Sequence, residues 1–330
     1  MNRKLVAVLL LVALALPLAA RGQAAETLPR VVVLGEFTTG ATVEIVEGLR
    51  QTMRELGWVE GRTFAVDVRY ASSLDQWPRI VAEVEQLKPS VIVSCAPCSF
   101  RIAPTGVTPI RDIPIVFVAV SDPIAAKMVD SLAKPGGNMT GVSYLGVELN
   151  VKRLQLLKEA LPNVARVGVL VLRDHPLRDR MVRELEEGAR ALNVKLLIVD
   201  VPSVREPPFD EAFQTLAAQG AEAVIALQGP PFNRERAKMA KLALHHRLAL
   251  VHEFAGSAEA GALLTYSPSA TELTRVAVGY VDKILKGARP ADLPVQQPTK
   301  VELVINLRTA RALGVTMPPA LVGRADRVIE

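Results

Sequence analysis

The side chains that could bind or transform a ligand stand just after short apolar runs, where predicted strands end. In the first half of the chain they are Glu36, Phe37, Thr38, Ser94, the loop residue Ala96, Ser121 and Asp122, and in the second half Asp174, His175, Gln228, Glu253 and Phe254. Such a mixture of carboxylates, hydroxyls, an amide and aromatic rings suits a zwitterion. Its carboxylate would take backbone N–H groups at a helix N-terminus, and its ammonium would pair with Asp122 or Glu253. The alternative, that some of these residues are only helix caps and turn residues, stays open.

Asp122 follows an unbroken apolar run from Ile115 to Val120, which indicates a parallel strand covered on both faces. Pro123 can occupy a first helical position and residues 125–134 are compatible with a helix, so Asp122 is predicted to cap that helix. Open α/β sheets bind ligands at the carboxyl ends of their strands, so Asp122 is also a candidate ligand residue.

Cys95 and Cys98 form a C-A-P-C motif directly after the apolar run 91–93. In an oxidising compartment the pair is predicted to form a small disulfide ring that stiffens a loop. The alternative is a thioredoxin-like redox site. We disfavour it because such a motif normally opens the first helix of its fold, whereas this one follows a later strand.

Signatures of catalysis and of metal binding are weak. The sequence contains no G-x-S-x-G elbow, P-loop or H-E-x-x-H motif, and no G-x-G-x-x-G follows the first predicted strand. The adjacent His245 and His246 would point to different faces, which does not suit one metal ion. The turn 135–141 follows a predicted helix instead of opening one, which favours a tight turn over a phosphate-binding loop. We expect no catalytic residue, no metal site and no cofactor.

The N-terminal segment has the pattern of a secretory signal peptide. Arg3 and Lys4 supply a positive start, residues 5–20 are uncharged and apolar, and small residues surround a predicted cleavage site after Ala24, with Ala20 as the alternative. No cysteine follows the apolar run, so the mature protein is predicted to be periplasmic and not lipidated. The run is shorter than the ~20 apolar residues that span a bilayer, which disfavours an uncleaved anchor.

Length and composition indicate about two globular domains. The chain has 330 residues, of which 50% are hydrophobic and 22% charged. The formal net charge is +5, but two of the positive charges lie in the predicted signal peptide, and the others are interspersed with acidic residues. This pattern disfavours nucleic-acid binding.

Predicted strands and helices alternate from residue 30 onward. In the first half the strands are 30–35, 63–70, 91–94 and 115–120 and the helices 42–57 and 77–87; in the second half the strands are 165–174, 194–200, 223–228 and 248–253 and the helices 177–192 and 209–219. Equivalent strands are offset by roughly 130 residues, which indicates two similar lobes. The predicted fold class is therefore α/β, with two doubly wound parallel-sheet lobes and a ligand cleft at the carboxyl ends of both sheets.

The last part of the chain is predicted to add short elements to both lobes. They are a strand over 262–267, a helix over 271–286, an extended segment over 293–306 and a helix over 307–314. A multi-strand hinge is expected near 142–147, 267–271 and 288–295. The predicted division is a signal peptide over 1–24, a first lobe of 25–143 plus 268–290, and a second lobe of 144–267 plus 291–330.

Four stretches, 121–143, 148–159, 279–306 and 310–319, resemble the uncharacterised ABC-transporter substrate-binding proteins related to tryptophan-binding lipoproteins. The resemblance covers essentially the whole mature chain. It implies a type I periplasmic-binding-protein fold and a captured small molecule, often an amino acid, delivered to a membrane permease and its ATPase. It carries an S-D-P motif onto residues 121–123 and a ligand loop onto 36–38. The chain departs from the family at C-A-P-C, and at Asp174 and His175, where relatives often show Asn-Pro.

We therefore predict a monomeric periplasmic solute-binding component of an ABC importer. Aromatic rings of Phe37, Tyr144, Phe254 and Tyr266 stand where they could stack on a ligand, which favours an aromatic or branched apolar amino acid. Two alternatives stay open. One is an exported enzyme that uses the cleft carboxylates or the C-A-P-C thiols, and the other is a ligand-sensing module that docks onto a membrane receptor.

Overall fold

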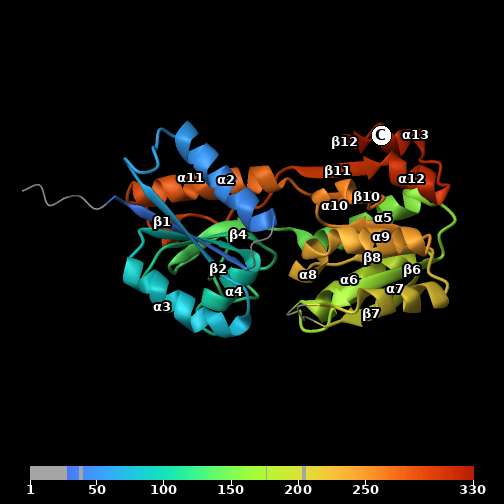
Figure 1. Cartoon of the computed structure of the whole chain (residues 1–330), viewed down its shortest axis with the longest axis horizontal. Coiled ribbons are helices and arrows are strands. Elements are labelled where there is room, and N and C mark those ends of the chain that lie inside the picture. The colour runs from blue at the N-terminus through green and yellow to red at the C-terminus, as the bar shows by residue number, and fades with distance from the viewer. Residues whose placement is uncertain (1–27, 37–39, 176, 203–205) are drawn as a thin grey trace, which may run out of the picture.

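The computed structural model describes residues 28–36, 40–175, 177–202 and 206–330. Two sheets, each covered by helices on both faces, form two lobes that lie side by side (Figure 1). We call the lobe around the five-stranded sheet the first lobe and the lobe around the seven-stranded sheet the second lobe. The predicted signal peptide and the predicted ligand residues Phe37 and Thr38 lie outside the described residues.

The first lobe contains a fully parallel sheet in the order β2-β1-β3-β4-β5. Its strands are β1 (Arg30–Glu36), β2 (Ala65–Ala71), β3 (Val91–Cys95), β4 (Ile115–Val120) and β5 (Met139–Ser143). Its helices are α2 (Gly40–Glu55), α3 (Trp77–Leu87), α4 (Ala96–Ile102) and α11 (Ala270–Leu285), with 3-10 turns η1 (Leu74–Gln76) and η2 (Pro290–Asp292). Helices α2 and α11 pack on one face of the sheet and α3 and α4 on the other (Figure 1).

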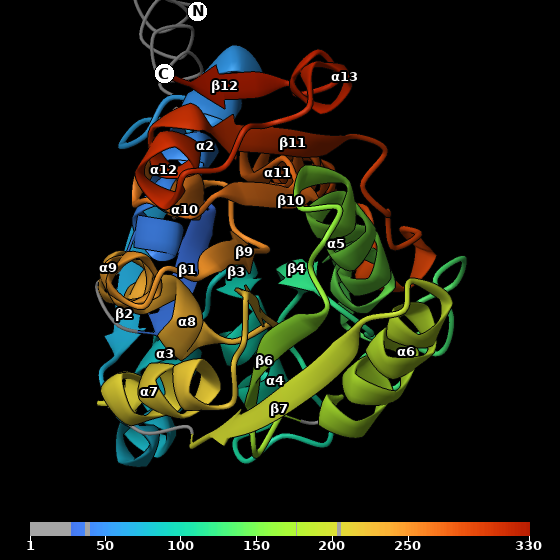
Figure 2. The ribbon, with the colours of Figure 1, turned by 90° about the vertical axis from the view of Figure 1, so that its right-hand side faces the viewer.

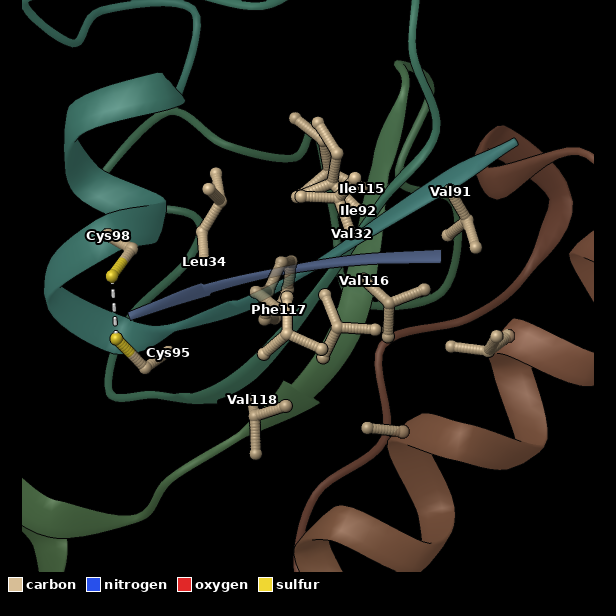
Figure 3. Packing of buried hydrophobic residues seen from close by; sticks show 14 of the residues in the cluster. Val32, Leu34, Val91, Ile92, Cys95, Cys98, Ile115, Val116, Phe117 and Val118 are labelled. Atoms are coloured by element: carbon tan, nitrogen blue, oxygen red, sulfur yellow. Dashed lines mark hydrogen bonds between the residues drawn. The ribbon is translucent and has the colours of Figure 1, made fainter. Parts of the chain in front are cut away.

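The strands of the first sheet are buried because helices cover both of their faces. Side chains of β3 and β4 are almost entirely enclosed, and Val116, Phe117 and Val118 belong to the same apolar cluster as Cys95 and Cys98 (Figure 3). The unbroken apolar run 115–120 therefore marks a central parallel strand, as the sequence predicted.

The second lobe contains a sheet in the order β12-β11-β10-β9-β8-β6-β7, parallel except where β11 pairs antiparallel with β10. Its strands are β6 (Arg166–Leu172), β7 (Lys195–Val201), β8 (Ala223–Ala226), β9 (Ala249–His252), β10 (Leu264–Pro268), β11 (Val301–Asn306) and β12 (Arg327–Ile329). Its helices are α5 (Gly146–Ala160), α6 (Arg178–Ala191), α7 (Phe209–Ala218), α8 (Pro230–Arg234), α9 (Arg236–His245), α10 (Gly256–Glu259), α12 (Leu307–Leu313) and α13 (Pro319–Val322).

Successive side chains of β6 enter two different cores. Val167 and Val169 pack in a cluster with residues of α5 and α6, whereas Leu170 and Leu172 pack in a cluster with residues of α7 and α9. This alternation follows from the period of two in a strand. Figure 2 shows α5 and α6 on one side of the strands and α7 and α9 on the other. The predicted α/β class with two parallel-sheet lobes is confirmed.

The chain passes from one lobe to the other after β5, after β10 and before β11 (Figure 1). Residues 293–296 run beside β5: Gln296 forms a bridge with Val142, and the Val295 N–H donates to the Leu132 carbonyl at 2.7 Å. By these contacts the stretch lies with the first lobe. We propose that the last lobe boundary follows Gln296 rather than residue 290, and the other predicted boundaries stay proposals.

Several local predictions were wrong. Residues 125–134 do not form an α-helix after Asp122; they form turns, and Lys127 has a left-handed backbone with φ of 53°. The C-A-P-C motif opens a short helix, α4, instead of lying in a loop. Part of the predicted turn 135–141 belongs to β5, and the sequence pattern missed α5 and α9.

Candidate functional site between the lobes

Ser121 and Gln228 join the two lobes directly. The Ser121 hydroxyl, which follows β4, donates to the Gln228 Oε1 atom, which follows β8, at 2.8 Å. Gln228 is buried, and its Nε2 atom has no hydrogen-bond partner among the described residues. Both residues were predicted from their places at strand ends, and the structure brings them together.

Gly146, at the start of α5, makes room for this contact. A Cβ atom at Gly146 would lie 1.2 Å from Gln228 Nε2 and 2.8 Å from a ring carbon of Tyr144. Only glycine leaves space for the amide side chain here, because real Cβ atoms do not approach heavy atoms so closely.

Tyr144 and Glu253 form a second contact. The Tyr144 hydroxyl donates to the backbone carbonyl of Glu253 at 3.1 Å. The Glu253 side chain turns its Oε2 atom into the protein, where it finds no partner within the described part of the chain. Burial raises the pKa of Glu253 to about 7, and the positive charge of Arg153 opposes this shift. Burial also raises the pKa of Tyr144, and the Glu253 charge adds to that shift.

Arg153 is a residue of this cluster that the sequence reasoning missed. It lies on α5 with 0% of its surface exposed. Its Nε donates to the Tyr266 carbonyl at 2.8 Å, and its Nη1 donates to the Gly146 carbonyl at 3.1 Å and to Asn150 Oδ1 at 2.7 Å. Its Nη2 has no partner among the residues that the structure describes.

A sequence signal for Arg153 does exist. Gly146, Asn150, Arg153, Leu157 and Ala160 follow one another at helical spacing and are all buried on α5. An arginine inside such a stripe is unusual, because charged side chains are rarely buried without a partner. The predicted pattern contained no helix here, so the stripe went unnoticed.

The carboxylate of Asp122 forms an ion pair with the second lobe and is not free to meet a ligand. Its Oδ1 accepts the Ala125 N–H at 2.9 Å, which caps a single turn. Its Oδ2 accepts Arg180 Nη1 of α6 at 2.8 Å, and Arg180 also reaches Glu148 at 3.1 Å and Glu184 at 2.8 Å. The predicted capping role of Asp122 therefore concerns a turn and not a helix, and its carboxylate pairs with an arginine of the second lobe.

The other predicted residues lie outside this cluster of contacts. Asp174 is exposed, and Ala96 is half-buried at the start of α4. Ser94 is fully buried, and its hydroxyl lies 2.6 Å from the hydroxyl of Ser99. The Phe254 ring is half-buried and lies 5.7 Å from the Arg236 guanidinium.

Cys95 and Cys98 are both buried, and their Sγ atoms lie 2.7 Å apart (Figure 3). Cys95 ends β3 and Cys98 lies in the first turn of α4. The pair is thus already adjacent, as a short-loop disulfide would require, and the predicted bond stays a prediction.

The histidines in this region carry no charge near neutral pH. His252 is fully buried, its Nδ1 lies 2.5 Å from the Ser257 hydroxyl, and burial lowers its pKa to about 3. Burial also lowers the pKa of His175 to about 4.

Within the described ranges, no group of three or more His, Cys, Asp or Glu side chains is placed to hold a metal ion.

Two hollows lie far from the interlobe contacts. One, of about 560 Å³, lies on α2 beside Arg50 and Arg54, and the other, of about 620 Å³, lies between α12 and α13 beside Val315 and Met317. Neither is lined by any of the predicted site residues that the structure describes. Among the helices that the structure describes, none is long and apolar enough to cross a membrane.

Comparison with known proteins decides the family. A sequence model described as "ABC transporter substrate binding protein" matches residues 31–329. The chain belongs to this family. Substrate-binding proteins of this kind bind a small ligand and work with ABC transporter components, and they are typically extracytoplasmic.

Relatives of this substrate-binding protein include amino-acid binders. It is 25% identical over 272 residues to the tyrosine-binding protein of Clostridioides difficile (strain R20291), covering 81% of this chain and 75% of the relative. The structure resembles that of a conserved domain protein from Vibrio cholerae O1 biovar eltor, with a TM-score of 0.83, 26% identity, and coverage of 92% of this chain and 100% of that one.

A third similar structure is a domain from Streptococcus pneumonia in complex with L-Trp, with a TM-score of 0.82, 21% identity and coverage of 92% and 100% of the two chains. The structural neighbours share the type I periplasmic-binding-protein fold, which confirms the predicted fold. The family, the tyrosine-binding relative and the protein solved with L-Trp are binding proteins and not enzymes, so the enzyme alternative is set aside.

Proposed function

We propose that this protein captures an α-amino acid or a closely related compound between its two lobes and delivers it to an ABC importer. The observation that carries this proposal is the set of buried polar atoms without partners among the described residues: Gln228 Nε2, Glu253 Oε2 and Arg153 Nη2. Leaving a buried donor or acceptor unsatisfied costs about 1–3 kcal/mol each, and more for a charged group. A ligand that offers both donors and acceptors would recover this free energy.

The relatives support an amino acid as the cargo. One is a tyrosine-binding protein, and another was crystallised with L-Trp. Tyr144 belongs to the polar cluster, Phe254 follows Glu253 in the chain, and the Tyr266 carbonyl accepts from Arg153, so aromatic side chains of a ligand could stack on these rings. Tyrosine and tryptophan are therefore the first candidates.

Transport would depend on closure of the two lobes around the ligand. The Ser121–Gln228 hydrogen bond and the Asp122–Arg180 ion pair both join the first lobe to the second, so both would break when the lobes separate. A ligand that touches both lobes favours the closed form over the open one. The permease and its ATPase would then distinguish loaded protein from empty protein.

The N-terminal sequence supports export. We propose that residues 1–24 are removed, that the mature protein acts as a monomer in the periplasm, and that it carries no lipid. Mass spectrometry of the protein purified from the periplasm would give its N-terminal residue. A mass that includes residues 1–20 or an added lipid would contradict this part of the proposal.

A thermal-shift screen of the chain from residue 25 onward, unfolded and refolded first to remove carried-over ligand, tests the proposed cargo. The probes are the twenty amino acids, sugars, and carboxylic acids without an amino group. A ligand at 100 times its Kd stabilises the folded state by about 2.7 kcal/mol, which is a shift of several degrees. We expect a shift with one or a few amino acids. A shift only with sugars, or with no compound, would refute an amino-acid cargo.

A further inference from the structure

We propose that Arg153 and Glu253 hold the two charged ends of the amino acid, with the ligand's carboxylate on Arg153 Nη2 and its ammonium on Glu253 Oε2. This inference rests on the proposed function and assigns its ligand contacts. It adds Arg153 to the site and replaces Asp122 as the partner of the ammonium.

Among the described residues, the guanidinium of Arg153 has no partner of opposite charge in direct contact. Its three hydrogen-bond acceptors are the carbonyl oxygens of Tyr266 and Gly146 and the amide oxygen of Asn150, all uncharged. Burying a guanidinium is strongly destabilising unless an anion compensates its charge. Nη2 is the atom left to meet that anion, and a carboxylate is the planar acceptor that a guanidinium binds best.

Within the described part of the chain, the carboxyl group of Glu253 lacks a hydrogen-bond donor, where Arg153 lacks an acceptor for Nη2. Its Oε2 atom is buried and has no donor within the described residues. Burial favours the neutral carboxyl, whereas a cation in contact with Oε2 would favour the carboxylate. An ammonium supplies both the charge and the N–H donors that this oxygen lacks.

The two groups face the same short segment, residues 144–146. The Tyr144 hydroxyl donates to the Glu253 carbonyl, and the positive charge of Arg153 opposes the rise that burial causes in the pKa of Tyr144. The Gly146 carbonyl accepts a hydrogen bond from Arg153. The Gln228 amide occupies the space that a Cβ at Gly146 would need. Arg153, Glu253 and Gln228 therefore all contact or abut residues 144–146, beside the Ser121–Gln228 contact between the lobes.

Asp122 does not suit the ammonium. Both of its carboxylate oxygens already have donors, the Ala125 N–H and the Arg180 guanidinium. A ligand ammonium at Asp122 would have to displace one of them, whereas Glu253 Oε2 has no described donor to displace. The site should accordingly require both charged groups of the ligand and reject uncharged sugars.

The first test leaves the protein unchanged. Isothermal titration calorimetry on wild-type protein would measure the Kd of L-tyrosine, L-tryptophan and the strongest other amino acid of the screen. The same titration would use the N-acetyl derivative, which lacks the ammonium, and the amide, which lacks the carboxylate. We expect each derivative of the bound amino acid to bind at least about 30-fold more weakly, because each loses a charge-assisted hydrogen bond in a buried site.

The second test changes the protein. Glu253→Gln keeps the size of the side chain and removes its charge, and Arg153→Lys keeps the charge and removes the forked donors. Each substitution should raise the Kd of the amino acid at least about 30-fold. Glu259→Gln is the matched control, since Glu259 is exposed on α10 and pairs with Arg327, and it should leave the Kd unchanged. If Arg153→Lys does not fold, the derivative series on wild-type protein still decides.

The outcomes separate the two proposals. If wild-type protein binds no amino acid, the proposed function and this inference fall together. If it binds an amino acid, and the N-acetyl derivative, the amide and the Glu253→Gln variant all bind as tightly, the assignment to Arg153 and Glu253 is wrong while the proposed function stands.

Discussion

The guanidinium of Arg180 on the second lobe donates to the carboxylate of Asp122 on the first lobe at 2.8 Å. Sequence reasoning placed Asp122 at a strand end, where it could pair with the ammonium of a ligand. The structure instead makes it one half of an ion pair between lobes. The Asp122 side chain is 22% exposed and that of Arg180 37%. The pair therefore resembles a surface salt bridge, which contributes about 0–1 kcal/mol to the free energy of unfolding.

Asp122→Asn should therefore change ligand affinity by less than about tenfold and the free energy of unfolding by about 1 kcal/mol or less. Calorimetry with the amino acid found in the screen and urea denaturation would measure the two effects. Glu184→Gln, which removes a partner of Arg180 within its own lobe, is the matched control. A far larger loss of affinity in Asp122→Asn alone would return Asp122 to direct ligand contact.

Gly146→Ala should disturb the contact between the lobes. The new methyl group would lie 1.2 Å from Gln228 Nε2, so the amide must move and the Ser121–Gln228 hydrogen bond would be lost. We expect a cost of about 1–3 kcal/mol in stability and weaker ligand binding.

Gly279→Ala is the control for this substitution. The position lies in α11, where an added Cβ would meet no atom of the described residues within 4 Å. The substitution should leave binding unchanged and stabilise the helix by about 0.5–1 kcal/mol. If Gly146→Ala and wild type have the same ligand affinity and the same free energy of unfolding, the observed position of Gln228 matters for neither.

Stability without ligand should depend on pH through Glu253. Its pKa is raised from 4.5 to about 7 in the folded protein, so the neutral carboxyl contributes stability below pH 4.5 that is lost as the pH rises through about 7. The loss from this group is at most about 3 kcal/mol. Arg153 and Tyr144 face Glu253, and the neighbouring His252 stays neutral in this range. Urea denaturation between pH 5 and 8 should show this dependence in wild type, and Glu253→Gln should lack it.

Ligand binding should have the opposite pH dependence. An ammonium pairs with the ionised carboxylate, so below pH 7 the Glu253 carboxyl must first release its proton to solvent. Affinity should therefore rise with pH up to about 7, and calorimetry in buffers of different ionisation enthalpy should detect proton release at pH 6. An affinity independent of pH between 5 and 8 would contradict the pairing of Glu253 with the ammonium.

Cys95 and Cys98 should be joined by a disulfide in protein purified from an oxidising compartment. Titration of the unfolded protein with a thiol reagent should find no reactive thiol without reductant and both thiols after reduction. Reduction should cost about 2 kcal/mol or less, since the closed loop is very short. A Cys98→Ser variant supplies the reference value of one thiol. Two reactive thiols in the protein before reduction would contradict the bond.

Much of the fold could be predicted because its signals are local. The run from Ile115 to Val120 needs no tertiary information to indicate a buried strand, and the pattern over 271–286 indicates a helix. The helix expected after Asp122 was wrong because propensity is a weak signal that tertiary contacts override. There the buried Met128 and Val129 follow a single turn that Lys127 ends.

The candidate site could be predicted only where it follows strands. Ser121, Gln228 and Glu253 stand at strand ends, and the carboxyl edge of a parallel sheet is a general place for ligands. Arg153 lies in the middle of a helix, and its importance comes from burial, which depends on how α5 packs against β9 and β10. Likewise, the sequence could not reveal that Asp122 meets Arg180, because the two lie 58 positions apart on different lobes.

Helix α11 comes from near the end of the chain, yet Leu273, Ala277, Val278 and Val281 complete the apolar core of the first lobe. Translation releases β1 to β5 long before these residues exist. Until α11 arrives, the side of β3, β4 and β5 that it covers stays exposed to water, so the N-terminal half cannot finish folding by itself. A nascent chain therefore remains loosely folded until it is nearly complete, and a loosely folded chain is the form that the export proposed above would require. A product that stops before residue 270 would leave β3, β4 and β5 uncovered on that side and would be a substrate for proteases.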